Sequence, residues 1–424
     1  MQEDYLHYLW KFKKIDTKHL ISVDGEVLNI LSVGQHNYNS GPDFFNAQIE
    51  IDNQLWAGNV EIHLKSSDWY VHNHETDKAY DNIILHVVWE HDVDVFRKNN
   101  TVISTLELQN YISKPVLDSY YKLYSGNKRW INCESDFKFT DEFLLKNWIE
   151  RLYFERLERK STQIEELLSV SNQNWEAVLF QMLAKNFGLK LNGEAFLSMA
   201  TSFDFSIVRK IQNKEALLEA LFHGQCGLLE EPIDEPYYVS LQNDYKFLSQ
   251  KFQLNNQKVL PVQFFRLRPP NFPTIRLSQL AQVYALNANL FSKIMEETSL
   301  EGFYTMFSVE TSEFWKNHYT FKKASKPVRK KISKSFTDLL LINTILPLKF
   351  SYGKYLGKDN SEVVLDLIKA IQPERNTIVE KFELLKPIFS SALQTQGVIQ
   401  LKTEYCNRNK CLQCAVGNSI LNRI

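Results

Sequence analysis

Gly41-Pro42-Asp43-Phe44 and Gly58-Asn59-Val60-Glu61-Ile62-His63-Leu64-Lys65 are the two stretches that decide the fold of the N-terminal part of the chain. Between them, residues 46–51 alternate polar and apolar side chains, as a half-buried β-strand does. Asp52-Asn53 has the composition of a tight turn, and residues 55–65 continue as a second extended segment. Together these segments predict a β-hairpin.

The hairpin lies inside a small α/β domain that we expect to occupy residues 1–110. Aromatic and leucine side chains recur near a 3.6-residue period in the first 20 residues and predict a helix there. Residues 83–89 and 102–108 have the composition of strands, and the polar connection 66–82 has room for one or two helical turns. The order is therefore helix, strand, hairpin, short helix, strand.

The rest of the chain predicts a larger helical region. From Asp141 onward, apolar residues recur every three or four positions with charged residues between them, which is typical of amphipathic helices. Breaks at Asn192-Gly193, Pro232 to Pro236 and Arg268-Pro269-Pro270 should divide this region, because proline removes a backbone donor and restricts the residue before it. We therefore expect an α+β protein with a small mixed-sheet α/β domain over 1–110, a linker over 111–139 and a larger all-helical region over 140–424.

The composition is that of an ordinary globular protein. At 424 residues the chain is too long for one hydrophobic core, and 44% hydrophobic with 23% charged residues excludes disordered and fibrous classes. The formal net charge is -1, so a nucleic-acid partner would have to be held by a local basic patch. The apolar runs are far shorter than a bilayer span needs, and Met1 to Trp10 lacks the pattern of a signal peptide. We expect a cytoplasmic protein with no membrane partner, and the composition leaves its oligomeric state open.

The hairpin carries three ionisable side chains on one expected face. Successive strand side chains point to opposite faces, so Glu61, His63 and Lys65 should line one side while the apolar residues between them enter the core. Asp43 stands at the mouth of the first strand, where pairing can bring its carboxylate beside that of Glu61. Two neighbouring carboxylates repel each other unless a cation lies between them, and Mg²⁺ or Mn²⁺ is the natural occupant. We expect such an ion on the open face of the hairpin, with Lys65 or His63 assisting hydrolysis.

These residues resemble the PD-(D/E)xK nuclease superfamily, in which a Pro-Asp opens one strand of a hairpin and a Glu-x-Lys lies on the next. Pro42, Asp43 and Glu61 match this pattern, but His63 stands where the lysine belongs and Lys65 follows two residues later. The resemblance implies a metal-dependent phosphodiesterase that acts on nucleic acid. The alternative is a catalytically inactive nucleic-acid-binding or scaffold protein with the same fold.

Further polar residues follow the hairpin. His72 and His74 are two positions apart and could reach a metal or a phosphate together, although isolated histidines are more often hydrogen-bonded structural groups. Asp77 extends the polar character of this connection. His86 interrupts the apolar segment 83–89, so it is either a satisfied core histidine or a group that points into the same site.

Longer phrases along the chain resemble one bacterial family. Besides the two stretches of the hairpin, they are Ile84 to Trp89, Arg266 to Arg276, and Tyr405-Cys406 followed by Cys411-Leu412-Gln413-Cys414. These phrases are similar to the family named domain of unknown function 2851, over essentially the whole chain. The family name brings no function with it, so the nuclease hypothesis depends on Asp43 and Glu61.

Two basic segments are candidates for binding anions. Arg266, Arg268 and Arg276 surround a rigid proline-rich turn and could form a phosphate-binding cluster, or could instead bind helix C-terminal carbonyl groups in a buried loop. Residues 322–334 carry seven basic side chains without an acid. Such a run is compatible with a solvated helix face or with a phosphate-backbone contact.

Three of the five cysteines crowd together near the end of the chain. Cys406, Cys411 and Cys414 suit zinc or an iron–sulfur cluster in a reducing compartment better than a disulfide framework. Both kinds of centre normally have four ligands, and Cys133 is the best candidate for the fourth, with Cys226 or a histidine behind it. The arrangement resembles nuclease domains in which one distant and three clustered cysteines hold a 4Fe-4S cluster. We expect a closed structural centre that contains Zn²⁺ or a 4Fe-4S cluster, and the spacing leaves both open.

Overall fold

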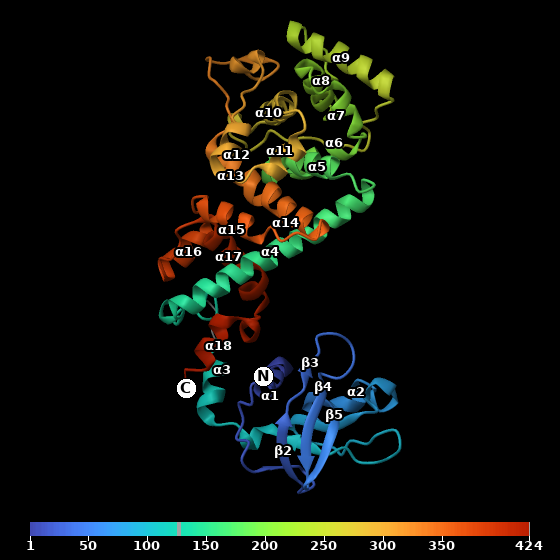
Figure 1. Ribbon diagram of the computed structural model, residues 1–424, viewed down its shortest axis with the longest axis vertical. Coiled ribbons are helices and arrows are strands. Elements are labelled where there is room, and N and C mark those ends of the chain that lie inside the picture. Colours follow the sequence, from blue (N-terminus) through green and yellow to red (C-terminus); the bar gives the residue numbers. More distant parts are fainter. Residues whose placement is uncertain (125–128, 424) are drawn as a thin grey trace. The chain divides into compact units, whose positions relative to one another are not determined.

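The computed structural model describes residues 1–124 and 129–423, and this part of the chain forms two compact units (Figure 1). The first unit contains a mixed sheet together with the last residues of the chain, and it consists of Met1–Trp148, Leu384–Lys386 and Leu401–Ile424. The second unit is mostly helical and consists of Ile149–Glu383 and Pro387–Gln400.

The first unit is built on one mixed sheet of seven strands. The strand order is β1-β2-β4-β5-β6-β7, and β3 also pairs with β4. Neighbouring strands are antiparallel as far as β5, whereas β5, β6 and β7 run parallel. The bounds are β1 (Leu20–Ile21), β2 (Val27–Ser32), β3 (Gln35–His36), β4 (Phe44–Ile51), β5 (Gln54–Lys65), β6 (Ile83–Glu90) and β7 (Thr105–Glu107). The predicted mixed sheet is confirmed, and β4 and β5 lie side by side in Figure 1.

The register of the hairpin determines which residues meet. Asp52-Asn53 forms its turn with positive φ angles, a conformation that Asp and Asn adopt more readily than other non-glycine residues. At the opposite end of the hairpin, Phe44 pairs with Val60, next to a bulge in β4. On the other side of β5, Glu61 pairs with His86 of the parallel strand β6. Glu61 therefore stands between the start of β4 and the middle of β6.

Short helices surround this sheet. They are α1 (Glu3–Lys11), α2 (Asp68–Val71), α3 (Lys114–Tyr124), α18 (Ala415–Leu421), the 3₁₀ helices η1 (His74–Thr76), η2 (Lys78–Tyr80), η3 (Leu108–Tyr111), η4 (Phe137–Phe139), η9 (Cys406–Arg408) and η10 (Cys411–Gln413), and the π-helical turn η8 (Leu401–Tyr405). α1 packs against β5, and its residues Tyr5, Leu9 and Trp10 are fully buried. Tyr5 also stacks on Tyr120 of α3 at 3.9 Å between ring centroids. The helix expected over the first 20 residues is therefore present but much shorter.

The expectation of an open face on the hairpin is wrong. Residues 59–63 of β5 are buried on both faces, and the exposed fraction is 4% for Glu61 and 1% for His63. α1 packs on this strand, and the chain after β5 folds back so that His72 contacts His63 and His74 contacts Glu61. Glu61 and His63 thus lie in a covered site and not on a solvated surface, whereas His72 is exposed at its edge.

The two units differ from the predicted division at residues 110 and 140. Residues 111–139, expected as a linker, carry α3 and the turn at Cys133, and they belong to the first unit. The end of the chain, expected in the helical region, also belongs to the first unit, where α18 packs beside α3. Periodicity indicated helices near the end of the chain but not in residues 111–139, and it carries no information about which distant segments a helix packs against.

Helices make up most of the second unit. They are α4 (Glu142–Val170, which begins in the first unit), α5 (Trp175–Phe187), α6 (Leu189–Thr201), α7 (Ser206–Ile211), α8 (Glu215–Gln225), α9 (Pro236–Phe252), η5 (Pro269–Asn271), α10 (Pro273–Leu286), α11 (Leu290–Glu296), α12 (Leu300–Met306), η6 (Glu313–Lys316), α13 (Lys334–Leu340), the π-helical turn η7 (Leu341–Ile345), α14 (Leu346–Tyr355), α15 (Ser361–Ala370), α16 (Thr377–Leu385) and α17 (Ala392–Gln400). The mostly helical character is as predicted, but β8 (His318–Thr320) and β9 (Lys323–Ala324) form a small sheet that was not. In the described part of the chain, no helix combines the length and the apolar character needed to cross a membrane.

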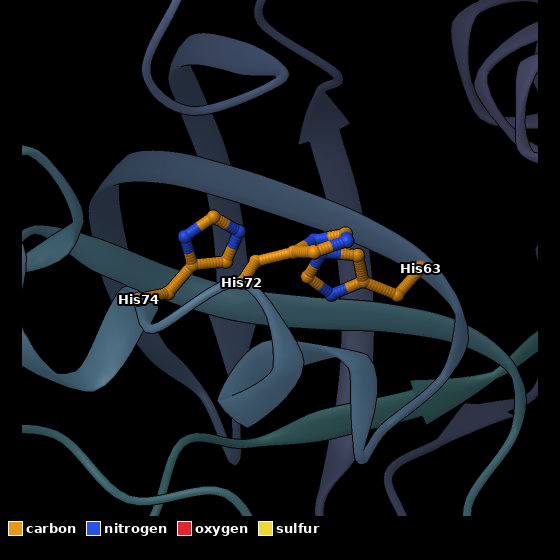
Figure 2. Close-up of side chains that lie close together, drawn as sticks. All are labelled: His63, His72 and His74. Atoms are coloured by element: carbon orange, nitrogen blue, oxygen red, sulfur yellow. The ribbon is translucent and has the colours of Figure 1, made fainter.

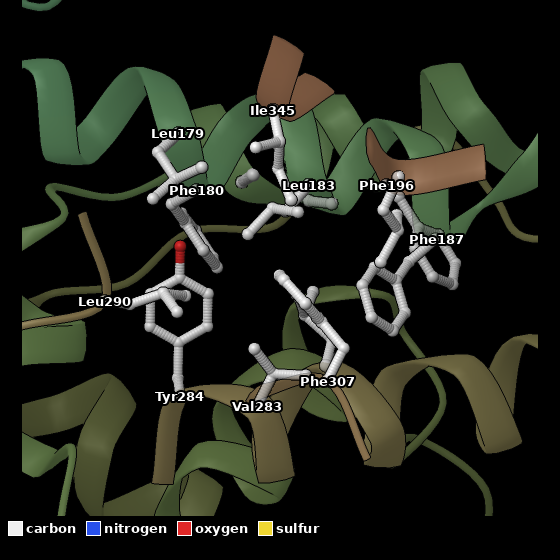
Figure 3. Packing of buried hydrophobic residues seen from close by; sticks show 14 of the residues in the cluster. Leu179, Phe180, Leu183, Phe187, Phe196, Val283, Tyr284, Leu290, Phe307 and Ile345 are labelled. Carbon is white, nitrogen blue, oxygen red and sulfur yellow. The ribbon is translucent and has the colours of Figure 1, made fainter. Parts of the chain in front are cut away.

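One apolar core holds the second unit together (Figure 3). Phe180, Leu183 and Phe187 of α5 lie opposite Val283 and Tyr284 of α10 in this core. All five side chains are almost completely buried, so their removal from water is a large part of what stabilises the unit.

The predicted break at Asn192-Gly193 is wrong, because both residues lie inside α6. A Cβ atom on Gly193 would lie only 3.1 Å from the carbonyl oxygen of Lys185 in α5. The glycine therefore permits close approach of two helices here and does not end one.

A buried carboxylate also stands in the second unit. Glu219 of α8 is fully buried and accepts hydrogen bonds from the hydroxyl groups of Tyr237, Ser278 and Ser312. Burial raises the pKa of Glu219 to about 7, and the hydroxyl donors only partly oppose that shift.

Candidate functional site

Asp43 and Glu61 meet at the junction of β4 and β5. The backbone N–H of Asp43 donates to Oε2 of Glu61 at 3.2 Å, and the backbone N–H of Ile62 donates to Oδ2 of Asp43 at 3.0 Å. Each carboxylate is thus held by the backbone of the opposite strand, so the strand pairing itself positions both groups.

Three histidines gather around Glu61. Nε2 of His74 lies 3.3 Å and Nε2 of His63 lies 3.5 Å from Oε1 of Glu61. Nε2 of His63 lies 3.1 Å from Nδ1 of His72. Figure 2 shows the side chains of His63, His72 and His74 close together, and one ring nitrogen from each lies within 4.8 Å of the other two.

The chain between β5 and β6 brings two of these histidines back to the sheet. α2 follows β5 directly, and the backbone N–H of Lys65 donates to the Asp68 carboxylate of that helix at 3.0 Å. Asn73 then adopts a left-handed conformation (φ 59°), which turns the chain between His72 and His74. His74 stacks on Tyr80 at 3.7 Å between ring centroids. These local turns explain why two residues in a polar connection reach a buried strand.

Asp77 and His86 have different places in this arrangement. The carboxylate of Asp77 accepts the backbone N–H of Ala79 at 2.9 Å and so caps η2 as a structural group. His86 is fully buried on β6, and its Nε2 lies 2.9 Å from Nδ1 of His63. This contact fixes the orientation of the His63 ring with Nε2 directed toward Glu61.

α1 supplies two residues that sequence reasoning did not include in the site. Nε2 of His7 lies 3.2 Å from Oδ2 of Asp43, and Glu3 lies one helical turn before His7, at 4.0 Å. The available signal was a polar i, i+4 pair on a helix whose other residues are largely apolar. That pattern shows a shared face of α1, but it does not show that this face meets β4.

Burial dominates the electrostatics of the site. It raises the pKa of Glu61 well above the ordinary value, and the neighbouring Asp43 carboxylate raises it further. It lowers the pKa of His63 to about 3, helped by repulsion from His74 and His72, and it lowers the pKa of His74 as well. Near neutral pH the site therefore disfavours ionised Glu61 and favours the neutral forms of His63 and His74.

His7 behaves in the opposite way to the other histidines. Burial alone would lower the pKa of His7, but the hydrogen bond and the negative charge of Asp43 raise it above the ordinary value. The positively charged form of His7 is thereby favoured next to Asp43.

Three separations between donor atoms beside Glu61 are compatible with ligands of one divalent cation, and the ring nitrogens of His63, His72 and His74 are the group that converges mutually. In a tetrahedral zinc site with bonds of about 2.0–2.1 Å, neighbouring donors lie roughly 3.3 Å apart. The separations of 3.1, 3.3 and 3.5 Å between the donors of His63, His72, His74 and Glu61 bracket this value. Nδ1 of His63 would remain free to donate to His86, which is the outer hydrogen bond that metal-bound histidines usually make.

Lys65 points to a different partner. Its ammonium group lies 3.6 Å from the carboxylate of Glu90, and both side chains are about half exposed. Lys65 lies at the end of the strand that carries Glu61, and its ammonium group contacts Glu90 of the neighbouring strand β6.

The three candidate arginines lie in the second unit in contrasting environments. Arg276 is buried in α10, where its guanidinium donates to Gln279 at 2.8 Å and to Asn271 at 2.6 Å. Arg266 and Arg268 are exposed. Arg276 thus donates from its two terminal nitrogens to neighbouring amide groups, and a shared anion-binding cluster of the three arginines stays a prediction.

The basic run 322–334 is not the helix face considered above. Most of it is an exposed extended segment that includes β9, and α13 begins only at its last residue. Lys330 is an exception, because it is buried and donates to the carbonyl oxygen atoms of Trp315 and Lys316.

Four of the five cysteines come together in the first unit. Cys133, Cys406, Cys411 and Cys414 line one small cavity there. Cys226 is buried in the apolar core of the second unit. Cys133 thus lies with the C-terminal cysteines, whereas Cys226 lies in the other unit.

Comparison with known proteins adds a family but no described relative. No curated protein matches the chain significantly, and no solved structure does. One family model, described as protein of unknown function (DUF2851), matches residues 3–377. The matched range includes the carboxylates and histidines of the first unit and Cys133, and it ends before the three C-terminal cysteines. Because this range covers most of the chain, the chain belongs to the DUF2851 family.

Proposed function

We propose that this protein is a metal-dependent phosphodiesterase that acts on nucleic acid, with a divalent cation held by Glu61, His63, His72 and His74. The observation that carries the proposal is the convergence of three histidines, two of which contact Glu61, beside a second carboxylate, Asp43, on one strand junction. Without a cation, Glu61 must hold a proton to avoid repulsion from the neighbouring Asp43 carboxylate, and a bound cation would replace that proton.

The donor set narrows the class of cation. Imidazole nitrogens suit zinc and neighbouring transition metals, whereas Mg²⁺ prefers oxygen ligands and retains several waters. With three histidines and one carboxylate, the site favours Zn²⁺ and accommodates Mn²⁺. The expectation of Mg²⁺ or Mn²⁺ considered only Asp43 and Glu61, and the present proposal keeps Mn²⁺ and adds Zn²⁺.

The resemblance to PD-(D/E)xK nucleases supports the phosphodiester as substrate. Pro42-Asp43 precedes β4, Glu61 lies in the middle of β5, and the two strands form one hairpin next to a parallel strand. His63, at the position of the usual lysine, is here a metal ligand. Lys65 pairs with Glu90, so a catalytic role for its ammonium group has less support.

The cation, Asp43 and His7 have separate roles in the proposed reaction. A cation bound at such a site lowers the pKa of water and stabilises negative charge on a phosphate group. Asp43 is held by His7 and by the Ile62 N–H through Oδ2, so its other oxygen can accept a hydrogen bond from the attacking water. The contact with Asp43 raises the pKa of His7, which favours a positive charge that can balance charge on the substrate.

A cleavage assay tests the proposal. Chelator-treated protein is assayed on single- and double-stranded DNA and RNA with added Zn²⁺, Mn²⁺ or Mg²⁺. We expect cleavage that depends on Zn²⁺ or Mn²⁺ and that falls at least about 100-fold in Asp43→Asn, as for removal of a group that acts in the transition state. Asp24→Asn, which changes an exposed carboxylate of the same unit, is the matched control and should retain full activity.

Two results would count against phosphodiesterase activity. Equal cleavage by wild type and Asp43→Asn would assign the activity to a contaminant. Binding of nucleic acid without cleavage under every metal condition would favour the alternative, a catalytically inactive nucleic-acid-binding protein.

A further inference from the structure

Four thiol groups from distant parts of the sequence surround one cavity in the first unit. Cys133 lies in the turn before η4, Cys406 begins η9, Cys411 begins η10, and Cys414 directly precedes α18. They line a cavity of about 20 Å³, and all four are unpaired cysteines. Apolar packing tends to close such gaps, because atoms that line a void lose their contacts on one side.

The four thiols line the same cavity, and Cys133, Cys411 and Cys414 are buried while Cys406 is half-buried. The backbone N–H groups of Gly417 and Val416 donate to the sulfur of Cys414. Thiols gathered around one cavity become strong ligands once a cation displaces their protons.

The surroundings of the thiols suit thiolate ligands. Nδ2 of Asn132 donates to Sγ of Cys411 at 3.4 Å. Lys402, held by the carbonyl oxygen of Trp130 at 2.8 Å, places positive charge near Cys406. N–H donors and nearby positive charge both stabilise negatively charged sulfur.

Gly417 allows α18 to pack closely against the loop that contains Cys411. A Cβ atom on Gly417, in the first turn of α18, would overlap the carbonyl oxygen of Cys411. The first turn of α18 therefore folds directly over the Cys411 loop, which brings Cys414 and Cys411 to the same side of the cavity.

We infer that Cys133, Cys406, Cys411 and Cys414 together bind one metal centre, either Zn²⁺ or an iron–sulfur cluster, through four thiolates. The centre fastens residues 401–423 to the rest of the first unit. Four thiolates complete the coordination of a structural centre, so it needs no further protein ligand. The proposal does not depend on the phosphodiesterase activity, because it concerns different residues and a different readout.

The proposed centre also lies next to α1, the helix whose His7 contacts Asp43. η10 packs against α1, and the hydroxyl of Tyr8 in α1 donates to Asn422 at 3.3 Å. His7, on the same helix, contacts Asp43. Loss of the metal should therefore loosen both the C-terminal segment and α1.

Metal analysis of the full chain, purified without oxygen, tests the inference. X-ray absorption at the metal edge should show sulfur ligands, which distinguishes this centre from the nitrogen and oxygen ligands proposed around Glu61. One zinc per chain with sulfur ligands identifies a zinc site, and iron with acid-labile sulfide identifies a cluster. The variants Cys133→Ala and Cys414→Ala should each lose this metal, whereas the matched control Cys226→Ala should keep it.

Hydrogen exchange supplies a second readout that does not depend on metal content. In Cys133→Ala, amide exchange in residues 401–423 and in α1 should accelerate at least about tenfold, while the second unit stays protected. The inference is overturned if wild type contains no sulfur-ligated metal, or if Cys133→Ala retains it. It is equally overturned if Cys226→Ala loses the metal to the same extent as Cys133→Ala.

Discussion

His72→Ala is the most discriminating single substitution at the proposed metal site. His72 is exposed, so its removal should change the free energy of unfolding of the metal-free protein by less than about 0.5 kcal/mol. Its Nδ1 lies 3.1 Å from Nε2 of His63 and is one of four proposed ligands. A four-ligand zinc site binds with roughly 10–16 kcal/mol, so one ligand contributes about 3 kcal/mol. The loss should weaken zinc binding about 100-fold.

Competition with a chromophoric zinc chelator measures this change on protein whose exchangeable metal has been removed. His19→Ala is the matched control, because His19 is an exposed histidine of the same unit and lines a separate pocket with Lys14 and Tyr111. His19→Ala should bind zinc as wild type does. Unchanged zinc affinity in His72→Ala, or an equal loss in His19→Ala, would refute the assignment of His72 as a ligand.

Three further predictions concern the strand, the second unit and Lys65. In Gly58→Ala, the new Cβ would lie 2.7 Å from the carbonyl oxygen of Asn82 and overlap the Ile84 side chain, so β5 must shift from β6. Urea denaturation should show a loss of about 1–3 kcal/mol, and an unchanged midpoint would contradict the close strand contact. For Glu219, a pKa of about 7 against an ordinary value of 4.5 means that the folded protein holds the proton more tightly. The free energy of unfolding should therefore fall by roughly 3 kcal/mol as pH rises from about 4.5 to 7, relative to Glu219→Gln. Parallel curves for the two proteins would show that Glu219 ionises normally. Lys65→Ala should leave metal-dependent cleavage within a few-fold of wild type, because the Lys65 ammonium lies at Glu90. A 100-fold loss in that assay would return Lys65 to the catalytic group.

Local patterns were sufficient to predict the hairpin and most of the helices. Alternation along residues 46–51 and the Asp52-Asn53 turn identified β4 and β5, because strand periodicity and turn chemistry are local properties. The break expected at Asn192-Gly193 was wrong because the role of Gly193 depends on a tertiary contact. Gly193 permits the close approach of α5, and the neighbouring residues in the sequence do not reveal that contact.

The candidate site was predicted only in part. The Pro-Asp and Glu motifs indicated Asp43 and Glu61, and strand alternation added His63. The convergence of His72 and His74 depends on the left-handed turn at Asn73, and the contact of His7 depends on how α1 packs. Alternation also gave no warning that the polar face is covered, since burial of both faces requires knowledge of what packs on the strand.

Anomalous X-ray diffraction from crystals of the zinc-loaded protein tests directly whether Glu61 and the three histidines bind a cation. We expect a zinc peak bonded to Oε1 of Glu61 and to ring nitrogens of His63, His72 and His74, at roughly 2.0–2.1 Å from each donor. A zinc-loaded crystal with no peak among these four side chains would contradict it.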